Sequence, residues 1–194
     1  MKEVGRDREV QELVRGNTRF AGGWPTHPHQ ARERRLETVT GQRPFAAILS
    51  CSDSRVPPEI VFDQGLGDLF VVRTAGHLLD ETVLGSLEYA VLHLKVPLVV
   101  VLGHTGCGAV AAAIAGGEGR GHLGRLVEAI RPAVEACDAK GSELLEEAVK
   151  EHVLRVAAEI EGTLPVLAPL VRDETLSVVG AIYRLDTGRV EFLK

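Results

Sequence analysis

The chain has 194 residues, of which 45% are hydrophobic, and this is enough for a single domain with a sizeable core. Its formal net charge of -5 and its lack of a large basic cluster argue against a nucleic-acid-binding protein. No apolar run reaches the roughly 18 to 20 residues that cross a bilayer, and the N-terminus lacks the apolar segment of a secretory signal, so we expect a cytoplasmic protein that does not bind membranes.

In chain order, short apolar segments alternate with amphipathic ones. A helix is expected near residues 7–15, and the stretch 22–29, which contains glycine and proline, is expected to form a loop. Strands are predicted at residues 45–50, 69–73, 97–102 and 176–184, with a last short strand at 189–193 after a turn. Helices are predicted at residues 82–94, 109–115, 123–137 and 142–161.

The predicted strands are mostly apolar throughout, which is typical of a sheet covered on both faces. Strands that alternate with helices through short connections favour an α/β fold. We therefore expect one domain over residues 1–194, built on a mainly parallel central sheet of four strands plus an antiparallel edge strand, flanked by helices.

Two cysteines and a histidine follow the ends of two predicted strands. Cys51 ends the first strand, while His104 and Cys107 come directly after the third. Ligand sites of parallel sheets form beyond the carboxyl ends of the strands, so these side chains are expected to meet. Two thiolates and an imidazole suit zinc, and three protein ligands with one open position are typical of a catalytic site. The sequence therefore predicts a catalytic Zn²⁺ site.

Asp53 and Arg55 are the candidates for assisting this metal. Because two thiolates cancel the charge of Zn²⁺, a bound water should be acidified less than at an all-histidine site, and help from neighbours is expected. The planar fork of Arg55 can hold the Asp53 carboxylate bidentately, away from the metal, where it accepts a hydrogen bond from bound hydroxide. In a closed, inactive state Asp53 would instead displace water and become the fourth ligand. Both states remain open.

Other interpretations of the cysteines explain less of the sequence. A hydrolase with Cys107 as nucleophile and His104 as base leaves the motif around Cys51 without a role. A closed structural zinc site needs a fourth cysteine or histidine, and Cys137 lies in a segment with no metal-binding motif. Cys137 is therefore expected to be a small structural residue.

The motifs resemble those of the β-class carbonic anhydrases. They are Cys-Ser-Asp-Ser-Arg at residues 51–55, His-Thr-Gly-Cys-Gly at 104–108 and Phe-Val-Val-Arg-Thr-Ala-Gly-His at 70–77. The resemblance implies reversible hydration of CO₂ to bicarbonate and a proton by zinc-bound hydroxide, with zinc held by Cys51, His104 and Cys107. It also implies an Asp53–Arg55 dyad that orients the hydroxide, and homodimers or tetramers with active sites at the subunit interface. Residues 1–40 would form a helical N-terminal arm that packs on a neighbouring subunit.

The resemblance also bears on substrate contacts and regulation. The backbone N–H of Gly108 can stabilise the developing anion. Gln64 lies near the family's substrate-facing glutamine, with a loop glutamine of no such role as the alternative. Members with an allosteric bicarbonate pocket carry tryptophan at the position of Ile48, so no such pocket is expected.

Two alternative functions are compatible with the same motifs. The same scaffold can hydrolyse CS₂ or COS. The second alternative is a zinc protein kept for regulation or assembly, in which Asp53 would stay permanently bound to the metal as its fourth ligand. His77 is a candidate for lining a subunit interface or a pocket rim, with a residue of no such role as the favoured alternative. The other histidines are expected at the surface or on helix faces: His27, His29, His93, His122 and His152.

Overall fold

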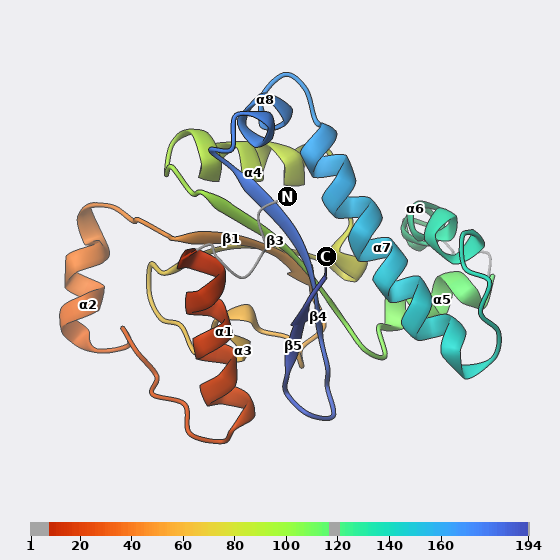
Figure 1. Ribbon diagram of the computed structural model, residues 1–194, viewed down its shortest axis with the longest axis horizontal. Helices are drawn as coiled ribbons and strands as arrows, with labels where there is room; N and C mark the ends of the chain where they lie inside the picture. The colour runs from red at the N-terminus through yellow and green to blue at the C-terminus, as the bar shows by residue number, and fades with distance from the viewer. Residues whose placement is uncertain (1–7, 117–120, 194) are drawn as a thin grey trace.

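The protein is described by a computed structural model that covers residues 8–116 and 121–193. At its centre is a five-stranded sheet with the order β2-β1-β3-β4-β5. The first four strands are parallel, and β5 pairs antiparallel with β4 (Figure 1). The strands are β1 (Ala46–Cys51), β2 (Leu69–Thr74), β3 (Leu98–His104), β4 (Ser177–Tyr183) and β5 (Val190–Phe192). This confirms the predicted fold class and all five predicted strands.

The two central strands explain why the strand segments are so apolar. Every residue of β1 and of β3 is buried, because both faces of these strands are covered. On one face Ala47, Val99 and Val101 pack with the helices α4, α7 and α8. On the other, Ile48 and Val100 pack with α1 and the short α3. In Figure 1, α4 and α8 accordingly lie above the sheet, and α1 and α3 below it.

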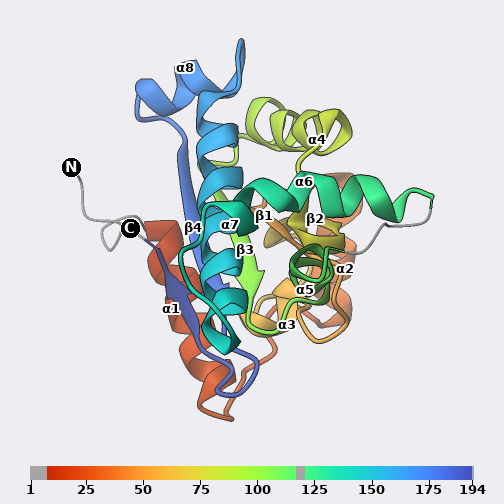
Figure 2. The same ribbon diagram turned by 90° about the vertical axis from the view of Figure 1, so that its right-hand side faces the viewer.

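The four helices predicted after residue 80 are present, with ends that differ by one or two residues. A third group of helices, α5 to α7, lies side by side near the carboxyl end of β3 (Figure 2). Three short helices were not predicted, since four to six residues carry too little periodicity. The helices are α1 (Arg8–Ala21), α2 (Arg32–Glu37), α3 (Pro58–Val61), α4 (Glu81–Leu92), α5 (Gly108–Ile114), α6 (Leu123–Glu135), α7 (Ser142–Gly162) and α8 (Leu167–Arg172), with 3-10 turns η2 (Thr38–Thr40) and η3 (Ala75–His77).

Helix α1 extends to Ala21 and is therefore longer than its prediction over residues 7–15. Its second half is held by the rest of the chain. The side chain of Asn17 donates to the carbonyls of Val61 and Gly188 and accepts from the N–H of Val190. Long-range bonds of this kind leave no local pattern in the sequence. The following stretch, residues 22–29, contains neither helix nor strand, as predicted.

Helix α2 differs from the other helices because it buries none of its residues. Leu36 within it and Val39 just after it are 56% and 74% exposed. Among the described helices, none is both long enough and apolar enough to cross a membrane.

Candidate metal centre

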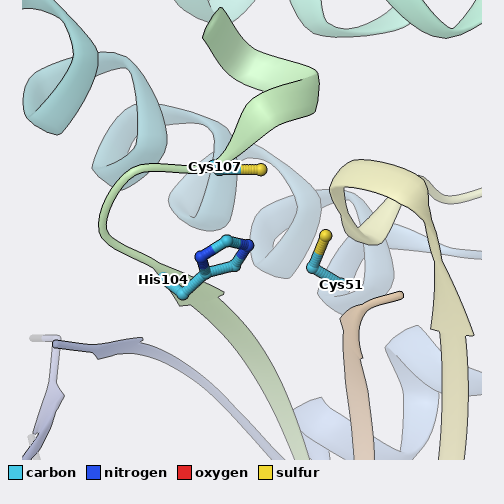
Figure 3. A group of neighbouring side chains, drawn as sticks. All are labelled: Cys51, His104 and Cys107. Atoms are coloured by element: carbon cyan, nitrogen blue, oxygen red, sulfur yellow. The ribbon is translucent and has the colours of Figure 1, made fainter. Parts of the chain in front are cut away.

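The three predicted ligands converge because of how the parallel strands end. Strand β1 ends at Cys51 and the adjacent β3 ends at His104, so both residues reach the same edge of the sheet. Cys107 immediately precedes α5, after a turn in which Gly106 has a φ of 65°. Figure 3 shows the two sulfurs and the imidazole turned toward a common space. All three residues are buried, and their ligand atoms lie within 4.8 Å of one another.

The imidazole of His104 is oriented for metal binding. Its Nδ1 lies 3.0 Å from the carbonyl oxygen of Thr105, which assigns the ring proton to Nδ1. Nε2 then carries a free lone pair, and it is buried with no hydrogen-bond partner. Leaving a buried acceptor unpaired is unfavourable, and a cation would relieve it. Metal-binding histidines commonly donate their second nitrogen to a carbonyl in this way.

The two sulfurs form a strongly coupled pair. The pKa of Cys51 is lowered, first because the thiol of Cys107 donates to its sulfur, and also because the N–H of Gly76 stabilises the thiolate. The pKa of Cys107 is raised, because the neighbouring Cys51 thiolate holds its proton and the site is buried. The pair thus favours a buried negative charge. Two such thiol ligands and a free imidazole nitrogen fit Zn²⁺ in both chemistry and spacing.

Asp53 lies at the edge of this cluster and is held by Arg55. Its Oδ1 accepts from the backbone N–H and from Nε of Arg55, both at 2.9 Å, and its Oδ2 accepts from Nη2 at 2.8 Å. These bonds from Arg55 hold the pKa of the carboxyl well below its usual range. Oδ2 also lies 3.8 Å from Nε2 of His104. The structure therefore places both predicted dyad residues beside the three ligands.

Two further groups support the site in ways that the sequence did not reveal. The guanidinium of Arg73 donates to the backbone carbonyls of Cys51 and Asp53, and so fixes the loop that carries the dyad. The backbone N–H of Gly76 donates to Sγ of Cys51 at 3.3 Å. Both come from the segment 70–77, which resembles the family. From the resemblance Arg73 was expected to brace the subunit interface, and no role was predicted for Gly76.

Two of the other histidines are buried. His77 is fully buried, so it lines neither a pocket rim nor a subunit interface. His152 is also buried, because the face of α7 that carries it packs against the turn η3, where its Nε2 donates to the carbonyl of Gly76. The rings of His77 and His152 lie against each other, with centroids 4.5 Å apart. The remaining four are exposed as expected: His27, His29, His93 and His122.

The other predicted residues lie in different surroundings. Gly108 begins α5, directly after the ligand Cys107. Gln64 is buried, and its amide donates to the carbonyl of Phe62 at 3.2 Å. It lines a surface cavity of about 410 Å³ that none of the three ligands of this chain lines. Cys137 is a free thiol whose Sγ donates to the carbonyl of Ala133, away from the cluster.

Comparisons with known proteins agree with this geometry. A sequence profile of the family described as carbonic anhydrase matches residues 46–190. A carbonic anhydrase from Mycolicibacterium smegmatis is 46% identical over 183 residues, which cover 92% of this chain and 89% of the relative. The β-carbonic anhydrase CcaA superposes with a TM-score of 0.76 at 27% identity, covering 95% of each chain.

A further solved structure extends the likeness to fungi. It is one of two tetrameric β-carbonic anhydrases from Sordaria macrospora, with a TM-score of 0.72 at 26% identity, and the match covers 96% of this chain and 98% of that one. The sequence profile alone spans well over half of the chain. The protein belongs to the β-class carbonic anhydrases and is accordingly a lyase of the carbonate dehydratase type.

Proposed function

We propose that this enzyme is zinc-dependent and catalyses the reversible hydration of CO₂ to bicarbonate and a proton. The observation that carries the proposal is the convergence of Cys51, His104 and Cys107, with the lone pair of His104 Nε2 buried and unpaired. These three residues would hold Zn²⁺. When bound, the ion lowers the pKa of a coordinated water toward neutrality and so supplies a nucleophile.

Asp53 and Arg55 would orient that nucleophile. A carboxylate offers about four acceptor positions, and Arg55 fills three of them. The remaining position belongs to Oδ2, the oxygen that lies 3.8 Å from His104 Nε2. Because Arg55 keeps the pKa of Asp53 low, this oxygen acts as an acceptor and not as a proton donor near neutral pH. It would accept a hydrogen bond from the attacking hydroxyl and turn the oxygen lone pair toward CO₂.

The closed alternative uses the same oxygen differently. In it, Asp53 would hold the metal together with the three other ligands in place of water, and we expect this closed state at lower pH and the open state at higher pH. The short distance from Oδ2 to His104 means that only a small movement separates the two states. Crystals of the zinc-loaded protein at acid and at alkaline pH test this, and identical zinc ligation in both would overturn it.

Other parts of the proposal concern substrate contacts. The N–H of Gly108 would stabilise negative charge that develops on the substrate oxygens. Gln64 does not line a cavity with the ligands of its own chain, so a contact with substrate would be made at the site of a neighbouring subunit.

We further propose a homodimer or tetramer in which residues 1–40 pack on a neighbour. Helix α2 supports this, because a helix that buries no residue in its own chain gains stability only from a partner surface. The structurally similar Sordaria macrospora enzymes are tetrameric. A cytoplasmic location is proposed because two of the metal ligands must stay reduced as thiols.

The test is a stopped-flow assay of CO₂ hydration on zinc-loaded enzyme from about pH 6.5 to 9. Activity should rise with pH as the nucleophile loses its proton, and Cys107→Ser should lose both zinc and activity. A sulfide-release assay with CS₂ or COS runs beside it. A zinc-loaded enzyme that releases sulfide but does not hydrate CO₂, or that does neither, would overturn the proposal.

A further inference from the structure

The turn η3 behind Cys51 has an unfavourable backbone. Gly76 and His77 both adopt left-handed conformations, with φ values of 69° and 44°. For a residue with a side chain, such as His77, this conformation is costly and persists only when its surroundings hold it in place. Glycine is favoured at position 76, because a Cβ there would lie 2.9 Å from Cδ1 of Ile130 and 3.0 Å from Cβ of Ala109.

This turn delivers the hydrogen bond to the Cys51 sulfur. The N–H of Gly76 points at Sγ of Cys51 at a distance of 3.3 Å. Glycine has the least restricted backbone of any residue, so this N–H does not keep its direction by itself. Contacts from outside the turn therefore help to set its orientation.

His152 supplies such contacts from α7. Its Nε2 donates to the carbonyl of Gly76 at 2.9 Å, and its ring packs against that of His77 at a centroid distance of 4.5 Å. Burial lowers the pKa of each ring and so favours its neutral form. One side chain thus restrains both left-handed residues at once. Within the turn, Thr74 adds a local bond from its hydroxyl to the carbonyl of Leu78.

We propose that His152 is a positioning residue for the metal site: by holding the carbonyl of Gly76 and the ring of His77, it keeps the Gly76 N–H directed at the Cys51 thiolate. The contacts run from α7 through η3 to the end of β1. The main one joins Gly76 and His152, which lie 76 positions apart in the sequence. It rests on the proposed function, since it assumes that Cys51 is a metal ligand.

The N–H has two effects on a metal thiolate. It stabilises the anion against protonation, so protons compete less well with a metal for Cys51. It also withdraws electron density from sulfur, which leaves more positive charge on the metal at a site where two thiolates would otherwise neutralise it. Outer-shell partners of metal ligands affect metal affinity by about 10- to 100-fold. Because His152 acts through Gly76, we expect the lower end of that range.

The experiment compares His152→Phe, which keeps a ring against His77 but has no donor, with His152→Gln, whose amide can donate to Gly76. Ile160→Ala, in the buried core further along the same helix, is the control for loss of stability alone. Zinc affinity is measured by competition with a chromophoric chelator. The sulfur-to-metal charge-transfer band of the Co²⁺-substituted protein reports on the thiolates directly.

We expect zinc affinity to fall about tenfold in His152→Phe, with a shifted charge-transfer band, and to return to within about threefold of wild type in His152→Gln. Ile160→Ala should lose stability while its band and affinity stay unchanged. If His152→Phe does not fold, His152→Leu, which also has no donor, replaces it in the same comparison. Two results would overturn the inference. One is wild-type zinc affinity and a wild-type charge-transfer band in the variant without a donor, and the other is a His152→Gln variant that is as impaired as that one. Failure of the wild type to bind zinc would instead overturn the proposed function.

Discussion

Replacing Gly76 by alanine tests how tightly the core closes around the metal site. An alanine at a φ of 69° carries the left-handed strain, about 1 kcal/mol. Its Cβ would also lie 2.9 Å from Cδ1 of Ile130 and 3.0 Å from Cβ of Ala109. The Ile130 side chain can rotate, but the Ala109 Cβ moves only with its backbone. Overpacking of this kind costs about 1–3 kcal/mol, so we expect a total loss of about 2–4 kcal/mol.

The chain offers two matched controls for this measurement. Gly23 has a φ of 79°, and a Cβ added there would have nothing within 4 Å, so Gly23→Ala should show the backbone strain alone, about 1 kcal/mol. Gly85 lies inside α4 with equally open surroundings, and Gly85→Ala should be stabilising by about 0.5–1 kcal/mol.

Urea unfolding of all three variants at one fixed protein concentration gives the comparison, because the stability of an oligomer depends on concentration. Only Gly76→Ala brings a Cβ close to Ile130 and Ala109. Its loss in free energy of unfolding should therefore exceed that of Gly23→Ala by about 1–3 kcal/mol. Equal losses in these two variants would refute the close packing of the turn behind Cys51.

Three further changes test the dyad, the N-terminal region and the subunit contact. Asp53→Asn removes the charged acceptor beside the ligands, so CO₂ hydration should fall about 10²-fold with zinc content unchanged, and a loss below about threefold would argue against the dyad. The carboxyl of Asp63 is buried, which favours its neutral form, but hydrogen bonds from Thr26 and Arg19 outweigh this and lower its pKa to about 2. In the unfolded chain the pKa of this carboxyl is about 3.9. Asp63 therefore stabilises the fold by about 2 kcal/mol above about pH 4, and this stabilisation is lost as the pH falls toward about 2. Urea unfolding from about pH 6 to 3 measures the difference in free energy of unfolding between wild type and Asp63→Asn. This difference should narrow below about pH 4, and a constant difference would contradict the prediction. Leu36→Glu places a charge on the exposed side of α2, and light scattering should show a smaller assembly, whereas an unchanged mass would place the subunit contact elsewhere.

The sequence by itself determined the sheet and the three ligands, because both follow from local pattern and one general rule. Buried parallel strands are apolar at nearly every position, and this made β1 and β3 recognisable. Their carboxyl ends share one edge, so Cys51 and His104 had to approach each other. The dyad was equally local, since Asp53 and Arg55 are two residues apart and bond within one turn.

Tertiary structure alone decided which groups support those ligands. His152 occupies a helix whose sequence does not distinguish a buried histidine from an exposed one, and its partner lies in a turn that only the packing of α7 brings near. The hydrogen bonds of Arg73 and Gly76 to the Cys51 region cross from β2 and η3 to β1. Such contacts depend on the distances between elements and on which face each element turns inward. Local periodicity carries no information on either, so these residues became visible only in the folded chain.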